Sequence, residues 1–160
     1  MKILVIYDSV FGNTKEIAKI IFNNLDTKEK QLLHVKDTNA LNFETELLIV
    51  GSPTRQFKAT QNIMAFIKQL SSGKVKSMKF ACFDTRVALD DIDSSFLRFM
   101  VNTGGYAAKK MKKALKKRGA QSVAETTGFF VEGQEGPLKT QEKERAAAWA
   151  KSIENSWKKS

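Results

Sequence analysis

Three short, almost uninterrupted apolar runs constrain this chain more than any other feature of its sequence. They cover residues 2–7, 46–51 and 78–84. Strands that are buried on both faces have this pattern, whereas strands with one wet face alternate between apolar and polar residues. Helical patterns separate the runs, so strand and helix alternate along the chain. This alternation predicts a parallel sheet with helices on both faces.

Weaker patterns between and after these runs complete the alternation of strands and helices. Two further strands are expected, at 31–35 and 121–131. Apolar residues at helical spacing predict helices, at about 14–25, 61–70, 106–117 and from 142 onward, with a short helix within 94–100. Thr60 is expected to cap the second helix, and Gly119 to follow the end of the third. No stretch reads as an interdomain linker or a repeat, so residues 1–160 are expected to form one α/β domain.

The net charge of the chain is unusual for its size. It is formally +10, and much of it comes from the stretch KKMKKALKKR at 109–118. Apolar residues recur on one face of this helix, so we interpret the lysines mainly as a solvated face. The alternative is a docking patch for an acidic protein. No recognised nucleic-acid-binding module accompanies the patch, so we expect no binding to nucleic acid.

Other bulk features suggest where such a chain works. No apolar run approaches the roughly 20 residues that a membrane span requires. The N-terminal stretch carries Asp8 and lacks a cleavage site of small residues, so we do not expect a signal peptide. With Cys82 as its single cysteine, the chain has no internal disulfide. We therefore expect a cytoplasmic protein without a membrane span, and a monomer, with a weak dimer as the alternative.

The loop between the first apolar run and the first helix has the pattern of a phosphate cradle. Backbone N–H groups at a helix N-terminus attract anions. Ser9 and Thr14 add hydroxyl groups, Asn13 adds an amide, and Gly12 allows close approach of the backbone to a ligand. Neither G-x-x-x-x-G-K-[ST] nor G-x-G-x-x-G is present. A two-component receiver domain would need a second acidic residue beside Asp8, which is missing.

The same stretch, VIYDSVFGNTKEIAKII, resembles the flavodoxin signature. The positions that agree are Val5, Ile6, Tyr7, Ser9, Gly12, Thr14, Ala18 and Ile21. The order of elements also matches over essentially the whole chain, and the last strand has no long insertion, as in the short-chain type. The resemblance implies a flavodoxin-like three-layer sandwich with a five-stranded parallel sheet of order 2-1-3-4-5. Phe11 departs from the pattern, because many flavodoxins have a threonine there.

The resemblance implies non-covalently bound flavin mononucleotide (FMN), held by three loops. The first would bind the phosphate through Ser9, Val10, Phe11, Gly12, Asn13 and Thr14. The second would lie beside the isoalloxazine ring, with Ser52, Pro53, Thr54, Arg55, Gln56 and Phe57. The third would border the pyrimidine edge with Phe83, Asp84, Thr85 and Arg86. Arg55 or Phe57 could stack on the ring, since these loops lack the tyrosine or tryptophan of many flavodoxins.

Two functions follow from the resemblance, and the sequence leaves both open. We favour an electron carrier that shuttles electrons between redox partner proteins and has no catalytic residues or metal of its own. The alternative is a small FMN-dependent oxidoreductase, similar to a quinone reductase or a protoporphyrinogen dehydrogenase. Residues 85–103 are the only candidate insert that could shape a substrate pocket. The SSFLRFM helix within that insert could be a partner or dimer surface, but we favour packing beneath the third loop.

Three other residues have structural interpretations. Asp8 is expected to accept hydrogen bonds or to cap the turn after the first strand. His34 stands alone in a weak strand and is interpreted as a surface or edge histidine. Cys82 lies in the middle of an apolar run and is interpreted as a small buried apolar residue.

Overall fold

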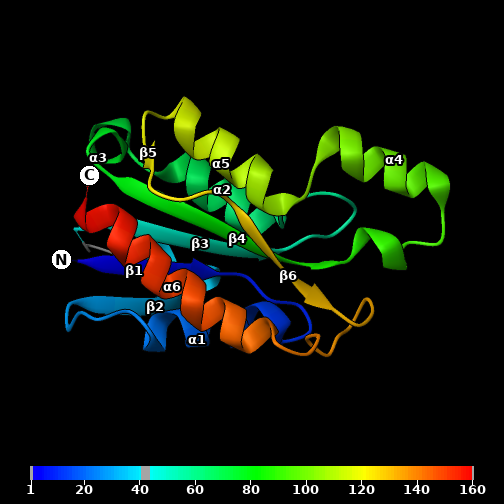
Figure 1. Ribbon diagram of the computed structural model, residues 1–160. Coiled ribbons are helices and arrows are strands. Elements are labelled where there is room, and N and C mark those ends of the chain that lie inside the picture. Colours follow the sequence, from blue (N-terminus) through cyan, green and yellow to red (C-terminus); the bar gives the residue numbers. More distant parts are fainter. Residues whose placement is uncertain (1, 41–43, 160) are drawn as a thin grey trace.

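Parallel strands form the centre of the structure, and helices cover both faces of the sheet (Figure 1). The computed structural model describes residues 2–40 and 44–159. The strands are β1 (Ile3–Tyr7), β2 (Lys30–His34), β3 (Leu47–Pro53), β4 (Lys79–Val87), β5 (Gln121–Ser122) and β6 (Thr127–Val131). Their order is β2-β1-β3-β4-β5, and β6 also pairs with β4. The order 2-1-3-4-5 is therefore confirmed, with a sixth strand added.

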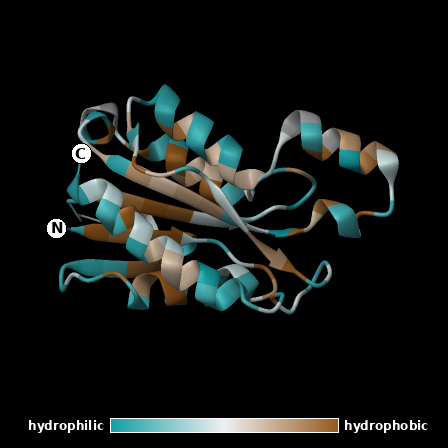
Figure 2. Cartoon of the chain, in the orientation of Figure 1, coloured by the Kyte–Doolittle hydropathy of each residue, from teal (hydrophilic) through white to brown (hydrophobic). Residues whose placement is uncertain are grey.

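Two pairs of helices enclose the sheet. Helices α1 (Asn13–Asn23) and α6 (Glu142–Lys158) cover one face, and α2 (Gln61–Gln69) and α5 (Ala107–Lys117) cover the other. The shorter elements are α3 (Ser72–Lys76), α4 (Ser95–Gly104) and the 3-10 helices η1 (Val35–Ala40) and η2 (Leu89–Asp91). In Figure 2 the central strands are the most hydrophobic segments and the outer helix faces are hydrophilic. Burial of these strands on both faces explains their continuous apolar runs.

The strand expected at 121–131 is divided into two short strands. β5 pairs with Lys79 and Phe80 at the start of β4, and β6 pairs with Phe83–Val87 at its end. Between them, the Ser122 hydroxyl donates a hydrogen bond to the Ala124 carbonyl oxygen at 2.9 Å. This local hydrogen bond competes with the hydrogen bonds of the sheet, so the expected strand is interrupted between β5 and β6. Both short strands still pair with β4.

β4 is longer than its apolar run suggests. It continues three residues beyond the expected end at 84, because Thr85, Arg86 and Val87 pair with Phe129, Phe130 and Val131 of β6. The residues assigned to a third loop, Phe83–Arg86, therefore belong to a strand. The expectation of a loop there was wrong, because the pairing partner lies more than forty positions further along the chain.

Helix α4 forms where a short helix was expected, but not in the expected surroundings. It stands away from the helices that cover the sheet (Figure 1). Val101 is buried, whereas Phe96 and Phe99 are 68% and 63% exposed. The expectation that this helix packs beneath the third loop was therefore wrong. Residues 85–87 already pair within the sheet, so no open loop is left there for the helix to cover.

Candidate functional site

The carboxyl ends of β1, β3 and β4 open into a cavity of about 580 Å³. Small-molecule and cofactor sites in proteins have volumes of roughly 300–1,000 Å³. Most of the residues expected from the sequence line this cavity: Ser9, Val10, Phe11, Asn13, Thr14, Pro53, Thr54, Arg55, Gln56, Phe57, Thr85 and Arg86. Segments that are far apart in the sequence thus meet at one edge of the sheet, as in other open α/β sheets.

Ser9 and Gly12 shape the first of these segments. Gly12 has a φ angle of 96°, in the left-handed region that side chains rarely adopt. The Ser9 hydroxyl oxygen accepts hydrogen bonds from the backbone N–H of Gly12 at 3.1 Å and of Lys15 at 3.3 Å. Ser9 therefore stabilises the turn into α1, a role that the expected phosphate contact did not include.

The first segment retains unsatisfied donors. In the described part of the chain, four backbone N–H groups of this segment have no hydrogen-bond acceptor, those of Val10, Phe11, Asn13 and Thr14. They lie at the positive end of the α1 dipole and border the cavity. Such a group of N–H donors is suited to an anion, and a phosphate is the usual one.

Two side chains expected to contact phosphate have partners within the protein. The hydroxyl oxygens of Thr14 and Thr85 are 2.7 Å apart, and both residues are buried. The Asn13 amide donates a hydrogen bond to the Glu135 carbonyl oxygen at 2.9 Å. Asn13 also leaves no room for a side chain at Gly136, where a Cβ would lie 2.5 Å from its Oδ1 atom. The Asn13 amide therefore joins the loop after β6 to the first segment.

The second segment contains a tight hairpin at residues 55–58. Arg55 and Lys58 exchange two backbone hydrogen bonds of 2.9 Å. Gln56 and Phe57 between them have φ angles of 46° and 63°. Two-residue hairpins of this kind usually contain asparagine and glycine, because both positions are left-handed. The Lys110 ammonium donates a 2.5 Å hydrogen bond to the Phe57 carbonyl oxygen and so holds the tip of the hairpin against α5.

Four of the expected residues do not line the cavity: Gly12, Ser52, Phe83 and Asp84. Ser52 is fully buried, and its hydroxyl donates to the Pro53 carbonyl oxygen and accepts from the Thr60 N–H. Phe83 is also fully buried and packs edge-on against Phe129 and Trp149. Both side chains therefore hold the strands and their neighbours together beneath the site.

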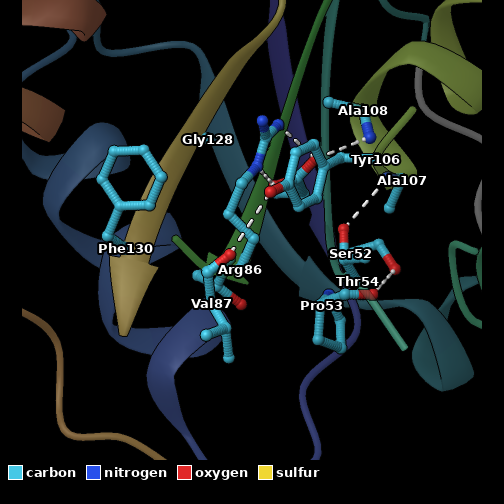
Figure 3. Close-up of polar contacts among 12 residues, drawn as sticks. Ser52, Pro53, Thr54, Arg86, Val87, Tyr106, Ala107, Ala108, Gly128 and Phe130 are labelled. Atoms are coloured by element: carbon cyan, nitrogen blue, oxygen red, sulfur yellow. Dashed lines mark hydrogen bonds and ion pairs between the residues drawn. The ribbon is translucent and has the colours of Figure 1, made fainter. Parts of the chain in front are cut away.

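Asp84 is fully buried and accepts hydrogen bonds from Arg86 of its own strand and from Ala108 of α5, both of which Figure 3 labels. Arg86 donates to its two carboxylate oxygens at 2.5 and 2.7 Å, and the backbone N–H of Ala108 donates to it at 2.8 Å. Beside it, the Thr54 hydroxyl accepts a hydrogen bond from the Ala107 N–H at 2.9 Å. Side chains of β4 and of the segment after β3 thus cap the N-terminus of α5, which has no cap of its own.

Arg86 occupies a narrow slot between Tyr106 and β6. Its guanidinium carbon lies 3.7 Å from the centroid of the Tyr106 ring, a stacked arrangement that favours arginine over lysine. A Cβ at Gly128 would lie 2.1 Å from the Arg86 Nε atom, so this position must be glycine for Arg86 to fit. Burial raises the pKa of the Asp84 carboxyl, and the hydrogen bonds from Arg86 oppose this shift.

The lining of the cavity is cationic. It includes Arg55 and Arg86 and no carboxylate side chain among the described residues. Asp84 balances the charge of Arg86. Arg55 has no ion pair in the described part of the chain, and its guanidinium lies 5.4 Å from the centroid of the Phe11 ring. Arg55 therefore supplies a cation beside the first segment, at the mouth of the cavity.

Sequence reasoning named residues 85–103 as a segment that could shape a pocket, but it did not name the residues on this side of the cavity. The additional lining residues are Val87, Ile92, Leu97, Val101, Tyr106, Val131 and Gln134. Most are apolar and come from residues 87–106, which begin at the last residue of β4 at the carboxyl edge of the sheet. The amphipathic spacing in α4 and its place after β4 were the available signals. The helix was expected to pack beneath the third loop, although a segment in this place can equally line a site at that edge.

Asp8 and His34 form a polar pair beside the first segment. The Asp8 carboxylate accepts hydrogen bonds from the Ser9 N–H at 2.9 Å and from the Asn62 amide at 3.2 Å. The His34 Nε2 atom lies 3.1 Å from Asp8 Oδ1. Asp8 is therefore a hydrogen-bond acceptor, as expected. His34 lies on the edge strand β2, as expected, but Asp8, just after β1, is its partner.

The strand order, the two helix layers and the cavity at the carboxyl edge define a flavodoxin-like α/β protein. A family model described as a flavodoxin domain matches residues 4–141. The chain therefore belongs to the flavodoxin domain family. A search of the curated proteins found no match.

Solved structures of flavodoxins share the fold over their whole length. Oxidised flavodoxin 1 from Bacillus cereus is 18% identical, with 97% of this chain and 98% of that chain covered and a TM-score of 0.71. A flavodoxin from the domain Archaea is 19% identical, with 98% and 99% covered and a TM-score of 0.71. A short-chain flavodoxin associated with a bacterial microcompartment is 19% identical, with 98% and 99% covered and a TM-score of 0.70.

Proposed function

We propose that this protein binds FMN non-covalently in the 580 Å³ cavity and carries electrons between redox partner proteins. The observation that carries the proposal is the first segment. Among the described residues, four backbone N–H groups there have no acceptor, and they border a cavity that no carboxylate lines. The Arg55 guanidinium adds a positive charge beside them. Donors and charge both match a phosphate group. Membership of the flavodoxin domain family supports FMN as the ligand that carries this phosphate.

The residues of the chain would each do part of the binding. The N–H groups of Val10, Phe11, Asn13 and Thr14 would hold the phosphate. The apolar side chains around Phe57 and Val87 would exclude water from the ring. Arg86 is held in one orientation by Asp84 and Tyr106, so it presents a fixed edge to the cavity. When bound, FMN supplies the one- and two-electron redox chemistry. The positive surface favours redox partner proteins with an acidic docking face.

One observation favours a small FMN-dependent oxidoreductase as a second candidate. Residues 87–106 add an apolar wall to the cavity, and they contain the segment that could shape a substrate pocket. Reduction tests separate the two functions. A carrier needs a reductase or a chemical reductant, whereas an oxidoreductase takes electrons from NADH or NADPH alone. Reduction of the flavin by either nucleotide within seconds would favour the oxidoreductase.

The cofactor proposal is tested by FMN uptake. The protein is expected to show a two-banded flavin spectrum as purified, or to gain one on addition of FMN, with one FMN bound per chain. The replacement Arg55→Glu should weaken FMN binding by about tenfold or more, which corresponds to roughly 1.4 kcal/mol. The physical reason is that an anion then faces the phosphate. Fluorescence titration of FMN measures the effect.

Lys28→Glu is the matched control for Arg55→Glu. Lys28 is exposed, lies just before β2 at the amino edge of the sheet, and its replacement changes the net charge by the same amount. It should leave FMN affinity within about twofold, because exposed charges separated by more than about 10 Å are largely screened. Equal losses in both variants would mean that total charge, and not Arg55, governs binding. Absence of any FMN uptake would contradict the cofactor proposal itself.

A further inference from the structure

The large apolar side chains that the described residues expose gather around the mouth of the cavity. They are Val10, Phe11, Phe96, Leu97 and Phe99, with exposed fractions of 51%, 45%, 68%, 40% and 63%. Val10, Phe11 and Leu97 also line the cavity, which places the two parts of the group side by side. We call these five residues the apolar rim. Exposed apolar groups of this kind mark an interaction site.

Helix α4 presents most of the apolar rim. It projects from the body of the molecule beyond the ends of the covering helices (Figure 1). Its base is tethered by an ion pair between Lys139 and Asp91 of η2, and by the hydrogen bond of Tyr106 to Val87. The helix contains no acidic residue and carries one exposed cation, Arg98. Phenylalanine and leucine on one face with a basic side chain are typical of helices that lie in a membrane interface.

Basic side chains border the apolar rim. Arg55 and Lys58 are exposed on the hairpin, and Lys109 is exposed in the first turn of α5. Three exposed carboxylates, Asp90, Asp91 and Asp93, precede α4 and oppose these charges, and Asp91 is paired with Lys139. Together with Arg98, the exposed cations outnumber the two carboxylates outside this ion pair, and the whole chain carries +10. Anionic headgroups would attract the cations, while the apolar side chains would enter the layer below the headgroups.

The shape of the rim favours a lipid surface over a protein. Helix α4 projects from the body of the molecule and so presents a convex surface (Figure 1). A projecting convex helix can enter a bilayer interface without a complementary groove. Within the described residues, no helix is long and apolar enough to cross a membrane.

We propose that the apolar rim docks on the surface of an anionic lipid bilayer, so that the mouth of the cavity faces the membrane. Docking would allow FMN bound in the cavity to exchange electrons with a redox-active molecule dissolved in the lipid. Only this consequence depends on the proposed FMN. Docking itself depends on the rim and on its neighbouring cations.

Vesicle co-sedimentation tests the proposal with the protein as purified. The protein should bind vesicles of phosphatidylglycerol and phosphatidylcholine, and bind vesicles of phosphatidylcholine alone at least tenfold more weakly. Phe96→Ser should reduce binding at least tenfold, because this residue is exposed and does not line the cavity. Arg98→Glu should do the same, whereas Lys28→Glu, with an equal charge change at the opposite edge, should change binding less than twofold. Far-UV circular dichroism and thermal unfolding check that each variant is folded.

Three outcomes would overturn the proposal. The first is absence of sedimentation with anionic vesicles. The second is equal loss in Arg98→Glu and Lys28→Glu, which would indicate attraction by total charge alone. The third is a dimer in analytical ultracentrifugation that Phe96→Ser abolishes, without vesicle binding. Phe96→Ser should take up FMN like the unmodified protein, and vesicle binding is measured with and without added FMN, so the docking and cofactor proposals fail separately.

Discussion

Replacing Arg86 with methionine is expected to destabilise the protein by about 3 kcal/mol at pH 7, the effect of removing one partner from a buried ion pair. Asp84 is fully buried and accepts hydrogen bonds from the Nε and Nη2 atoms of Arg86, while the Arg86 side chain is only 15% exposed. Methionine fills a similar volume without charge. The Asp84 carboxylate would then retain the hydrogen bond from Ala108 but lose its counter-ion. Urea unfolding measures the change.

The loss should depend on pH. Burial already raises the pKa of Asp84, and removal of Arg86 takes away the main opposing influence. The folded variant would therefore bind this proton more tightly than the unfolded chain, whose aspartate pKa is about 3.9. Its free energy of unfolding should fall as pH rises between these two pKa values, by up to about 1.4 kcal/mol per pH unit. Urea unfolding at pH 5 and pH 7.5 should give a larger difference for the variant than for the unmodified protein.

Two comparisons test the assignment to the buried pair. Lys112→Met removes an ion pair with Glu125, whose side chain is 93% exposed, and should cost less than about 1 kcal/mol. The double variant Asp84→Asn/Arg86→Met should recover most of the loss, because asparagine can still accept the Ala108 N–H without a charge. A loss below 1 kcal/mol in Arg86→Met, with unchanged pH dependence, would mean that Asp84 does not need Arg86.

Gly51→Ala is the second substitution with a large expected effect, a loss of about 3 kcal/mol, the upper end for overpacking a core. A Cβ at this position would lie 2.1 Å from the Cζ atom of Phe83, with two more ring atoms at 2.5 and 2.6 Å. The ring cannot easily move, because it is fully buried and packs against Phe129 and Trp149. The Gly51 carbonyl oxygen also accepts the Asp8 N–H at 3.1 Å, so displacement of β3 would disturb the first segment of the site.

Gly73→Ala is the control for this prediction. No atom lies within 4 Å of a Cβ built at Gly73 in α3, and alanine in a helix is favoured over glycine by roughly 0.8–1 kcal/mol. Gly73→Ala should therefore raise the free energy of unfolding slightly. If Gly51→Ala does not fold, the double variant Gly51→Ala/Phe83→Leu should restore folding by removing the ring. Unchanged stability in Gly51→Ala would refute the close contact between β3 and Phe83.

Features that depend on neighbouring residues could be predicted from the sequence alone. The Thr60 side chain accepts the Ile63 N–H at 3.4 Å and so caps α2, as its position indicated. Gly119 follows the end of α5 with a φ angle of 97°, as expected for a glycine after a helix. The continuous apolar runs predicted the buried strands. These predictions succeed because strand burial and helix capping depend on a few consecutive residues.

The arrangement of the candidate site was predicted only in part. Its first two segments line the cavity largely as expected, because each follows a buried strand directly. The third was expected as a loop with four ligand residues, yet only Thr85 and Arg86 line the cavity, and both belong to β4. The roles of Asp84 and Arg86 depend on α5, Tyr106 and Gly128. No pattern within one segment shows which of these groups will meet.

The sequence by itself determined the alternation of strands and helices, the strand order through its family signature, and the phosphate-cradle pattern after β1. Only the tertiary structure decided that β4 continues into a pair with β6, that Asp84 and Arg86 are joined beside α5, and that α4 projects with its apolar side chains exposed. The physical reason is the sequence separation of the partners. The hydroxyl groups of Thr14 and Thr85 meet across 71 positions, and such a contact exists only after every intervening element has packed.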